Sequence, residues 1–254
     1  MYHIHLNSKA WLRWAATLCT VLLLGLLVKN LRLYGFTLHE WLSENSSGRV
    51  LNHAEGQSKR IALTVDDGPD RVYTPKILTL LRRYGYHATF FPIGNRLKTA
   101  PECIQRILDD GHTIGNHSWS HGHLESMNAV DIRSELSKFD TALREFTDKK
   151  TYLVRLPRGY WNPIVFAEVA HKKSFIIDWS VSLEHKGLVS ANDMATRALD
   201  QIRPGSVLLM HEGAAHNRQA SVDALGIILE RLSQAGWDVV TVEDLFPKTR
   251  YAMP

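Results

Sequence analysis

From about Lys59 onwards, short apolar runs of the strand type alternate with longer amphipathic runs of the helix type. Strands joined through helices form parallel βαβ units, whose crossovers are almost always right-handed. The pattern therefore predicts an α/β fold with a parallel sheet, which either closes into a barrel or stays open. The predicted strands are Ile61–Val65, Ala88–Ile93, Thr113–Gly115, Tyr152–Arg155, Ser174–Trp179, Ser206–Met210 and Trp237–Val242. The predicted helices are Pro75–Tyr84, Pro101–Asp109, Ala129–Phe146, Pro163–His171, Ala191–Ile202 and Gln219–Gln234.

The N-terminus follows a different pattern. The run Trp14–Val28 contains no charged residue and approaches the length of a membrane-spanning helix. No small-x-small cleavage site follows it, so an uncleaved anchor is favoured over a removable signal peptide or a buried core helix. An anchor of this kind is single-pass and places the rest of the chain on the extracytoplasmic side, whereas cleavage would secrete it. We predict an anchor over residues 1–31, a linker over 32–58 and one domain over 59–254.

Composition and charge exclude several classes of protein. With 44% hydrophobic and 22% charged residues, the chain has ordinary globular composition, which excludes collagen-like and disordered chains. Its two cysteines are too few for a disulfide framework. The net charge of +4 comes from residues 1–39, which contain Lys9, Arg13, Lys29 and Arg32 and no acidic residue. Because the remainder is neutral overall, we expect no nucleic acid among the partners.

Polar residues follow several predicted strands at their C-terminal ends, where parallel α/β folds place their functional groups. Each has an ordinary explanation by itself, since Asp-Gly-Pro is a common turn and surface histidines are frequent. Their convergence on one edge of the sheet favours a shared site. The residues are Asp66 and Asp67 after the first strand, His117 and His121 after the third, Arg155 at the fourth and His211 at the sixth.

These residue types suit a metal-dependent hydrolase. His117 and His121 are four residues apart, a spacing that places two imidazoles on one side of a helical turn, and with a carboxylate they form a metal triad with open positions. A second carboxylate beside the metal is a general base for water, and a further histidine protonates the leaving group of an amide or ester. The same ligands also suit Fe(II) and oxygen chemistry, so ligand type alone does not decide between the two.

The order and context of these residues resemble the polysaccharide deacetylase family, also called the NodB-homology or carbohydrate esterase family 4 domain. The resemblance covers residues 59–245, and four motifs occur in the family's order. T-F-D-D-G corresponds to Thr64–Gly68, H-[ST]-x-x-H to His117–His121, R-x-P to Arg155–Pro157, and L-x-H to Leu209–His211.

The resemblance implies a distorted (β/α) barrel of about seven strands, preceded here by the predicted transmembrane helix. It also implies a role for each motif residue. Asp67, His117 and His121 would bind a divalent metal, with Zn²⁺ expected and Co²⁺, Mn²⁺ or Ni²⁺ as alternatives. Asp66 would be the general base, oriented by Arg155, and His211 the general acid. The backbone amide of Arg158 would stabilise the oxyanion.

The implied activity is hydrolytic N-deacetylation of an amino-sugar glycan, with release of acetate. We expect peptidoglycan as substrate, at N-acetylglucosamine or N-acetylmuramic acid, because the predicted anchor places the domain beside the cell wall. The R-x-P-R-G sequence at Arg155–Gly159 also resembles the branch of peptidoglycan N-acetylmuramic acid deacetylases. The alternatives are a deacetylase of chitooligosaccharides or another surface polysaccharide, and a catalytically impaired glycan-binding homologue.

Two positions depart from the family pattern. Arg158 follows R-x-P where most members have an aromatic residue. The fourth family motif, D-x-x-D-W, is not intact: either Asp178-Trp179 stands in for its end, or the motif aligns over Ser182–Lys186 with its acids replaced. The second alignment leaves the group that tunes His211 unidentified.

Overall fold

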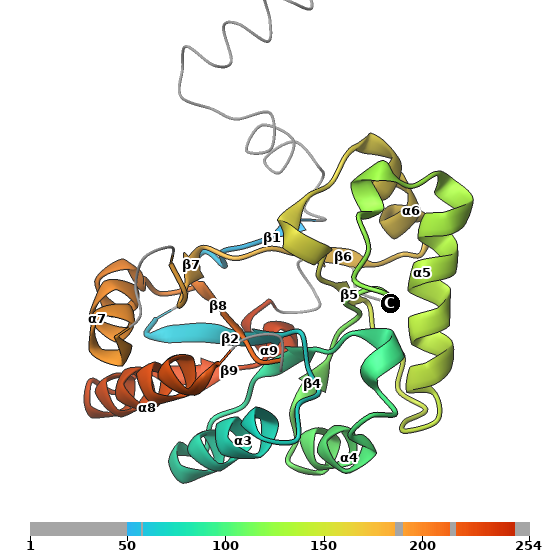
Figure 1. Ribbon diagram of the computed structural model, residues 1–254. Coiled ribbons are helices and arrows are strands. Elements are labelled where there is room, and N and C mark those ends of the chain that lie inside the picture. The colour runs from blue at the N-terminus through green and yellow to red at the C-terminus, as the bar shows by residue number, and fades with distance from the viewer. Residues whose placement is uncertain (1–49, 57, 186–189, 214–216, 247–254) are drawn as a thin grey trace, which may run out of the picture. The chain divides into compact units, whose positions relative to one another are not determined.

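Parallel strands form two sheets in this computed structural model, which describes residues 50–56, 58–185, 190–213 and 217–246 (Figure 1). One sheet has the order β4-β3-β2-β8-β7 with β9 beside β2, and the other has the order β1-β6-β5. The strands are β1 (Val50–Leu51), β2 (Arg60–Asp66), β3 (Thr89–Phe91), β4 (Thr113–Ile114), β5 (Leu153–Val154), β6 (Phe175–Ile177), β7 (Val181–Ser182), β8 (Val207–His211) and β9 (Asp238–Val240).

Two isolated bridges join the sheets. Asn116 pairs with Val154, which links the end of β4 to β5, and His53 pairs with Ser206, which links the segment after β1 to the start of β8. Seven strands thus follow one another in a ring that is only partly hydrogen-bonded, in the order β1, β6, β5, β4, β3, β2 and β8. This ring is the geometry expected of a distorted barrel, and β7 and β9 lie beside it.

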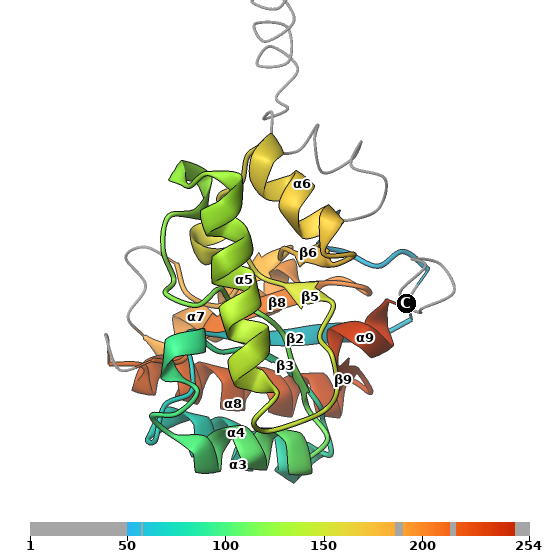
Figure 2. The same ribbon diagram turned by 90° about the vertical axis from the view of Figure 1, so that its right-hand side faces the viewer.

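The helices lie outside the strands. Figure 2 shows α5 and α6 over the β5–β6 sheet, with α3, α4 and α8 below the larger sheet. The predicted bounds of α4, α6 and α8 agree with the structure, whereas α5 ends three residues earlier than expected. The helices are α3 (Tyr73–Tyr84), α4 (Pro101–Asp109), α5 (Ala129–Leu143), α6 (Pro163–His171), α7 (Ala191–Gln201), α8 (Gln219–Gln234) and α9 (Val242–Leu245), with short 3₁₀ turns η1 (Gly94–Arg96), η2 (Leu124–Ser126) and η3 (Pro157–Gly159).

The alternation of side chains along β2 decides what faces the barrel interior. Ile61, Leu63 and Val65 pack outward, in the apolar cluster that the surrounding helices cover. Ala62 packs inward, in a second cluster with Val207 of β8 and with residues of β3, β5 and β6. Because strand side chains alternate with period two, Asp66 and His211 point to this interior side at the ends of their strands.

The folded unit begins earlier than the sequence predicted. β1 lies inside the predicted linker 32–58, and Val50 pairs in register with Ile176 of β6. The segment after β1 packs closely against Gly205, which precedes β8. A Cβ at Gly205 would lie 1.8 Å from the carbonyl oxygen of Ala54. Two residues of strand carry no alternation that a sequence pattern reveals, so β1 was not among the predicted strands.

The predicted anchor 1–31 lies outside the described residues. Over the ranges that the structure does describe, no helix has both the length and the apolar character needed to cross a membrane.

We expect Asn116→Ala to lower the free energy of unfolding by about 2 kcal/mol, because it leaves buried polar groups without partners. The Asn116 amide donates to the Leu136 carbonyl and to Asp140, and its oxygen accepts the Ser118 N–H. Urea denaturation monitored by circular dichroism measures the change. Asn95→Ala, at an exposed position, should shift the midpoint little. Equal shifts in the two variants would contradict this role of Asn116.

Candidate active site and metal centre

Two of the predicted site residues are neighbours across the sheet. Asp66 and His211 are register partners, because β2 and β8 run in parallel and end at the same row. Asp66 is almost fully buried, and His211 is partly exposed at the end of its strand. The strand ends therefore bring a carboxylate and an imidazole to one mouth of the barrel.

Arg155 holds Asp66 in place. Its side chain is fully buried, and Nη1 donates to both carboxylate oxygens of Asp66, at 3.1 and 3.0 Å. Nη2 donates to Thr64 Oγ1 and Nε donates to the carbonyl of Ile177, so the guanidinium connects β2 with β6. The guanidinium therefore holds the Asp66 carboxylate in a fixed orientation through charge-assisted hydrogen bonds.

The predicted metal ligands converge beside this pair. One ligand atom each from Asp67, His117 and His121 lies within 4.8 Å of the others. Asp67 Oδ1 is 3.5 Å from His117 Nε2 and 3.4 Å from His121 Nε2, and this buried oxygen has no hydrogen-bond partner among the described residues. An unpaired buried carboxylate oxygen that faces two imidazole nitrogens fits a bound cation.

The neighbours of the triad also fit a metal centre. His117 Nδ1 lies 2.8 Å from the Arg155 carbonyl and donates to it, which leaves the lone pair of Nε2 facing the site. Burial raises the pKa of Asp67, but the His117, His211 and His121 rings outweigh burial and hold that pKa well below its usual range. Burial and then the His117 ring lower the pKa of His121. Anionic Asp67 and neutral His121 are the forms that bind a metal.

The two histidines do not lie on a helical turn, contrary to the prediction from their spacing. Residues 116–121 form a loop, in which Ser118 and His121 have positive φ values of 59° and 57°. Asp67 also has a positive φ, of 73°. Left-handed backbone at residues other than glycine is sterically costly and is concentrated at functional sites. Here this backbone conformation brings the ring centres of His117 and His121 to 4.9 Å from each other.

The sequence analysis missed Glu184 as the partner of His211. Glu184 Oε1 accepts the backbone N–H of His211 at 3.1 Å, and Oε2 lies 3.2 Å from His211 Nδ1. Burial lowers the pKa of His211, but the hydrogen bond that the His211 ring donates to Glu184, with the charges of Asp66, Glu184 and Asp67, raises it above the usual value. Glu184 lies in Ser182–Lys186, one of the two alternative alignments of the fourth motif. That alignment is the sequence signal that points to Glu184.

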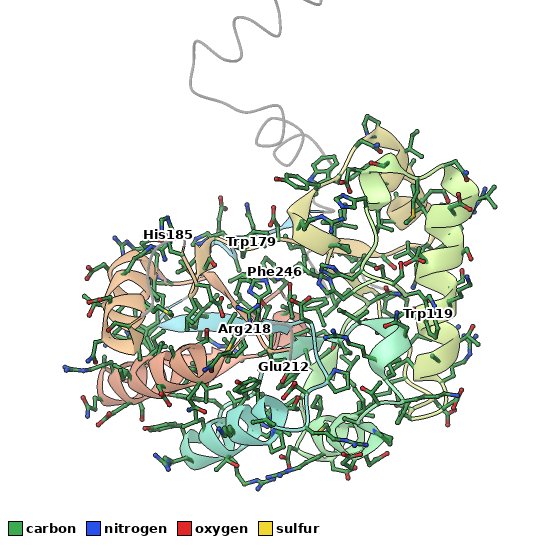
Figure 3. The ribbon with its side chains drawn as sticks, viewed as in Figure 1. Trp119, Trp179, His185, Glu212, Arg218 and Phe246 are labelled. Atoms are coloured by element: carbon green, nitrogen blue, oxygen red, sulfur yellow. The ribbon has the colours of Figure 1, made fainter. Side chains whose placement is uncertain are left out.

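Asp178, the other candidate for this role, accepts a hydrogen bond from the backbone N–H of Trp179. Trp179 follows β6 (Figure 3), and its ring lies 5.4 Å from the guanidinium carbon of Arg155. This end of the broken motif therefore packs against the buried arginine, whereas Glu184 contacts the histidine.

Glu212 packs against the turn after β2 that contains Asp67. It lies between β2 and α3 (Figure 3), where its backbone N–H donates to the Asp66 carbonyl and Oε2 accepts Thr74 Oγ1 at 2.5 Å. A Cβ at Gly68 would lie 1.9 Å from Glu212 Oε1, so only glycine fits there. Complete burial raises the pKa of Glu212 to about 8. Glu212 therefore acts on the turn and does not line the site.

Arg158 lies on η3, directly after β5. Its side chain is exposed and its φ is 60°, the left-handed value. Its charge is one of the smaller influences that lower the pKa of His121, after burial and the His117 ring.

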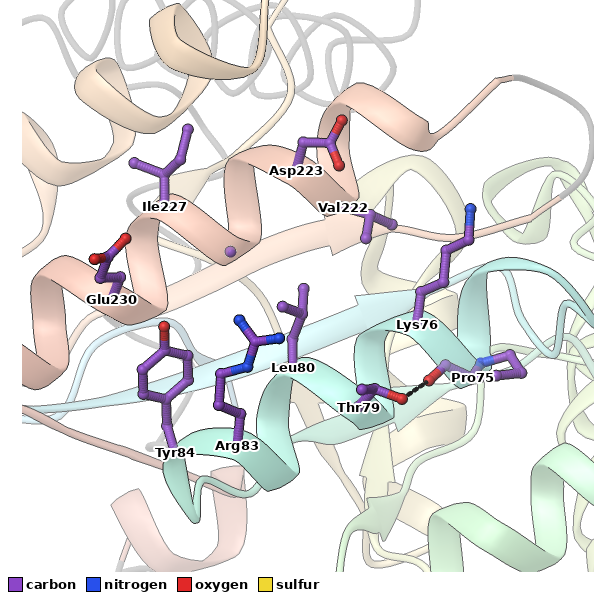
Figure 4. A pocket seen from close by; sticks show the side chains of 11 residues that line it. Pro75, Lys76, Thr79, Leu80, Arg83, Tyr84, Val222, Asp223, Ile227 and Glu230 are labelled. Carbon is purple, nitrogen blue, oxygen red and sulfur yellow. Dashed lines mark hydrogen bonds between the residues drawn. The ribbon is translucent and has the colours of Figure 1, made fainter.

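A separate groove of about 600 Å³ lies between α3 and α8 (Figure 4). Leu80, Val222 and Ile227 contribute apolar side chains to it, and its charged lining residues are Lys76 and Arg83 of α3 and Asp223 and Glu230 of α8. None of the motif residues lines this groove. The chemistry therefore belongs to the strand ends and not to this hollow between helices.

We expect Asp67→Ala to lose stoichiometric metal, because it removes the anionic ligand between the two imidazoles. Asp66→Asn should keep the metal, since Asp66 pairs with Arg155 and is not one of the three ligands. Elemental analysis of both variants after dialysis against metal-free buffer measures the metal content. One metal ion per chain in Asp67→Ala would refute this ligand assignment.

We expect Glu184→Gln to lower the pKa of His211, because it replaces a carboxylate acceptor by a neutral amide. His211 would then lose its proton at a lower pH than in the parent chain. NMR titration of the His211 ring measures the shift directly. Asp178→Asn is the matched control and should leave the titration unchanged; the opposite result would assign the role to Asp178.

Comparison with known proteins agrees with this geometry. The family model for polysaccharide deacetylase matches residues 53–173. A peptidoglycan-N-acetylglucosamine deacetylase of Bacillus cereus is 35% identical over 191 residues, covering 75% of this chain and 69% of that protein. The peptidoglycan-N-acetylmuramic acid deacetylase PdaA of Bacillus subtilis is 31% identical over 205 residues, covering 78% and 75%.

A solved structure shows the same fold. The crystal structure of a peptidoglycan N-acetylglucosamine deacetylase superposes with a TM-score of 0.76 at 32% identity, and the match covers 81% of this chain and 96% of that one. The shared sequence extends over most of both chains. The chain therefore belongs to the polysaccharide deacetylase family.

Proposed function

We propose that this protein is a metal-dependent hydrolase that removes N-acetyl groups from peptidoglycan. The observation that carries the proposal is the arrangement of Asp66 and His211 on adjacent strand ends, beside the triad of Asp67, His117 and His121. Metal-dependent amide hydrolysis requires a proton acceptor, a proton donor and a metal centre close together, and this end of the barrel offers residues for all three.

The ligand set favours zinc, since two imidazoles and one carboxylate with open positions are typical of hydrolytic zinc sites. Cobalt, manganese and nickel are the alternatives. A divalent ion bound there would polarise the acetyl carbonyl and lower the pKa of water.

The residues of the chain divide the proton transfers between them. Asp66, oriented by Arg155, accepts a proton from the attacking water. Protonated His211, whose pKa the Glu184 hydrogen bond raises, donates its proton to the departing nitrogen. The amide C–N bond breaks, and acetate and a free amine leave the site. The backbone amide of Arg158 is proposed to stabilise the negative charge on the carbonyl oxygen.

The substrate assignment draws on the relatives. They include deacetylases of both N-acetylglucosamine and N-acetylmuramic acid in peptidoglycan, and this chain covers more than two thirds of each. Both sugars therefore belong to the proposal. Chitooligosaccharides and other surface polysaccharides remain the alternative substrates, and a panel of glycans distinguishes them.

The two other classes of function account for less of the site. A catalytically impaired glycan-binding homologue was suggested by the altered fourth motif, but Glu184 supplies a carboxylate to His211 in that segment. An Fe(II) oxygenase would use the triad, but it has no role for the Asp66–Arg155 pair or for His211. Hydrolysis uses all of these groups.

We further propose that residues 1–31 anchor the protein in the cell membrane, with the domain on the extracytoplasmic side. The uncharged run Trp14–Val28 and the preceding Lys9 and Arg13 support this placement. It would bring the domain to the cell wall, where its proposed substrate lies.

We expect residues 41–254, which include all the described residues of the domain, to release acetate from purified peptidoglycan. Chelation should abolish the release and added Zn²⁺ should restore it. Asp66→Asn should lower kcat by about 10²–10⁴-fold with its metal retained, because it removes the base. Asp109→Asn, at an exposed position, is the control for the loss of one carboxylate.

Acetate assayed enzymatically gives the rate, and mass spectrometry of the digested glycan identifies the sugar that lost its acetyl group. Full activity in Asp66→Asn would refute the assigned base. A folded, metal-loaded protein that releases no acetate from peptidoglycan, chitooligosaccharides or other acetylated glycans would refute the proposed activity.

A further inference from the structure

A cluster of basic side chains lies on the face of the domain away from the site. It is formed by the turns that lead into β5 and β6, and it lines a hollow of about 440 Å³. Two acidic residues, Asp140 and Asp148, line the same hollow. The five basic residues, here called the basic face, are Arg144, Lys149, Lys150, Lys172 and Lys173.

Most of this charge is available to a partner. Lys172 forms an ion pair with Asp140, with Nζ and Oδ2 2.7 Å apart, and Arg144 donates to the hydroxyl of Thr141. Lys149, Lys150 and Lys173 are exposed, and no acidic group of the described ranges lies within ion-pair distance of them. The basic face therefore presents uncompensated positive charge to its surroundings.

The register of the smaller sheet locates the basic face. Leu153 of β5 pairs with Phe175 of β6, so Lys150 and Lys173 come just before the N-terminal ends of these two parallel strands. The site lies at the C-terminal ends of the strands, and β2, with seven residues, spans about 23 Å between the two edges. The basic face and the site are thus at opposite ends of the barrel.

The N-terminal segment joins the domain at this same edge. Val50, the first described residue, pairs with Ile176 of β6 in a parallel ladder. The residue before Val50 is therefore covalently attached at the N-terminal edge of β6, which is the edge that carries Lys172 and Lys173. In the sequence, the proposed anchor over residues 1–31 precedes a strand that begins at the edge carrying the basic face.

From this placement we propose that the basic face binds the anionic phospholipid surface of the membrane and directs the site away from it. The inference rests on the anchoring proposed above, because the anchor would hold the basic face within reach of lipid headgroups. Basic side chains close to a membrane surface are attracted by anionic lipids, and the attraction falls off within a Debye length. An active site on the far end would then face the glycan and not the bilayer.

The test uses the full chain in lipid nanodiscs of phosphatidylcholine alone or mixed with phosphatidylglycerol. Acetylation of Lys149 and Lys150 by an amine-reactive ester, followed by mass spectrometry, reports their accessibility, with Lys138 of α5 as the internal reference. We expect acetylation about fivefold slower on the anionic discs, the factor for one basic side chain held at an anionic surface. High salt should remove the difference.

A matched pair of variants isolates the basic face. Arg144→Glu with Lys173→Glu should abolish the difference between the two lipids while leaving the reporter lysines in place. Arg83→Glu with Arg231→Glu makes the same charge change at exposed positions on α3 and α8 and should retain the difference. Equal acetylation rates on the two lipids in the parent chain would overturn the proposal. So would an undiminished difference between the lipids in the variant with Arg144→Glu and Lys173→Glu.

Two further results separate this inference from the others. If the chain elutes apart from the discs, the anchoring is refuted, and sedimentation of the same chain with anionic vesicles then tests the basic face directly; failure to sediment overturns the proposal. Binding to soluble polyphosphate without binding to vesicles would also overturn it and would indicate an anionic polymer as the partner. Acetate release from soluble glycan fragments, measured on the same samples, tests the proposed activity independently.

Discussion

The buried ion pair between Arg155 and Asp66 organises the functional end of the barrel. The guanidinium donates to Asp66 and Thr64 on β2 and to the Ile177 carbonyl on β6, and it lies 4.9 Å from the centre of the Phe91 ring. A carboxylate in so apolar an interior is stable only with such a partner. The pair therefore connects the two sheets and fixes the carboxylate of Asp66, the proposed proton acceptor, where the strands end.

The metal centre and the histidine opposite depend on the same residue and strand. The Arg155 carbonyl accepts a hydrogen bond from His117 Nδ1 and thereby sets the tautomer of a proposed metal ligand. His211 lies beside Asp66 because their strands are in register, and Glu184 orients its ring from the neighbouring segment. Removing Arg155 would leave Asp66 unpaired in the interior, a change that costs about 3–5 kcal/mol in other proteins.

The opposite ends of the strands have different chemistry. The C-terminal ends gather carboxylates and imidazoles on strained loops, including the left-handed residues Asp67, Ser118 and His121. The N-terminal ends of β5 and β6 carry the basic face and the point where the N-terminal segment joins. In a parallel barrel all strands share one direction, so the site and the basic face are separated by the length of the strands.

The sequence by itself determined the alternation of strands and helices, the bounds of α4, α6 and α8, and the set of residues that meet at the strand ends. These follow from local periodicity and from motifs, which a chain carries without its fold. Only the tertiary structure decided that β1 joins the sheet, that the histidine loop is not helical, and that Glu184 rather than Asp178 contacts His211. Two-residue strands have no periodicity, and the partner of a side chain depends on backbone positions that distant segments set together.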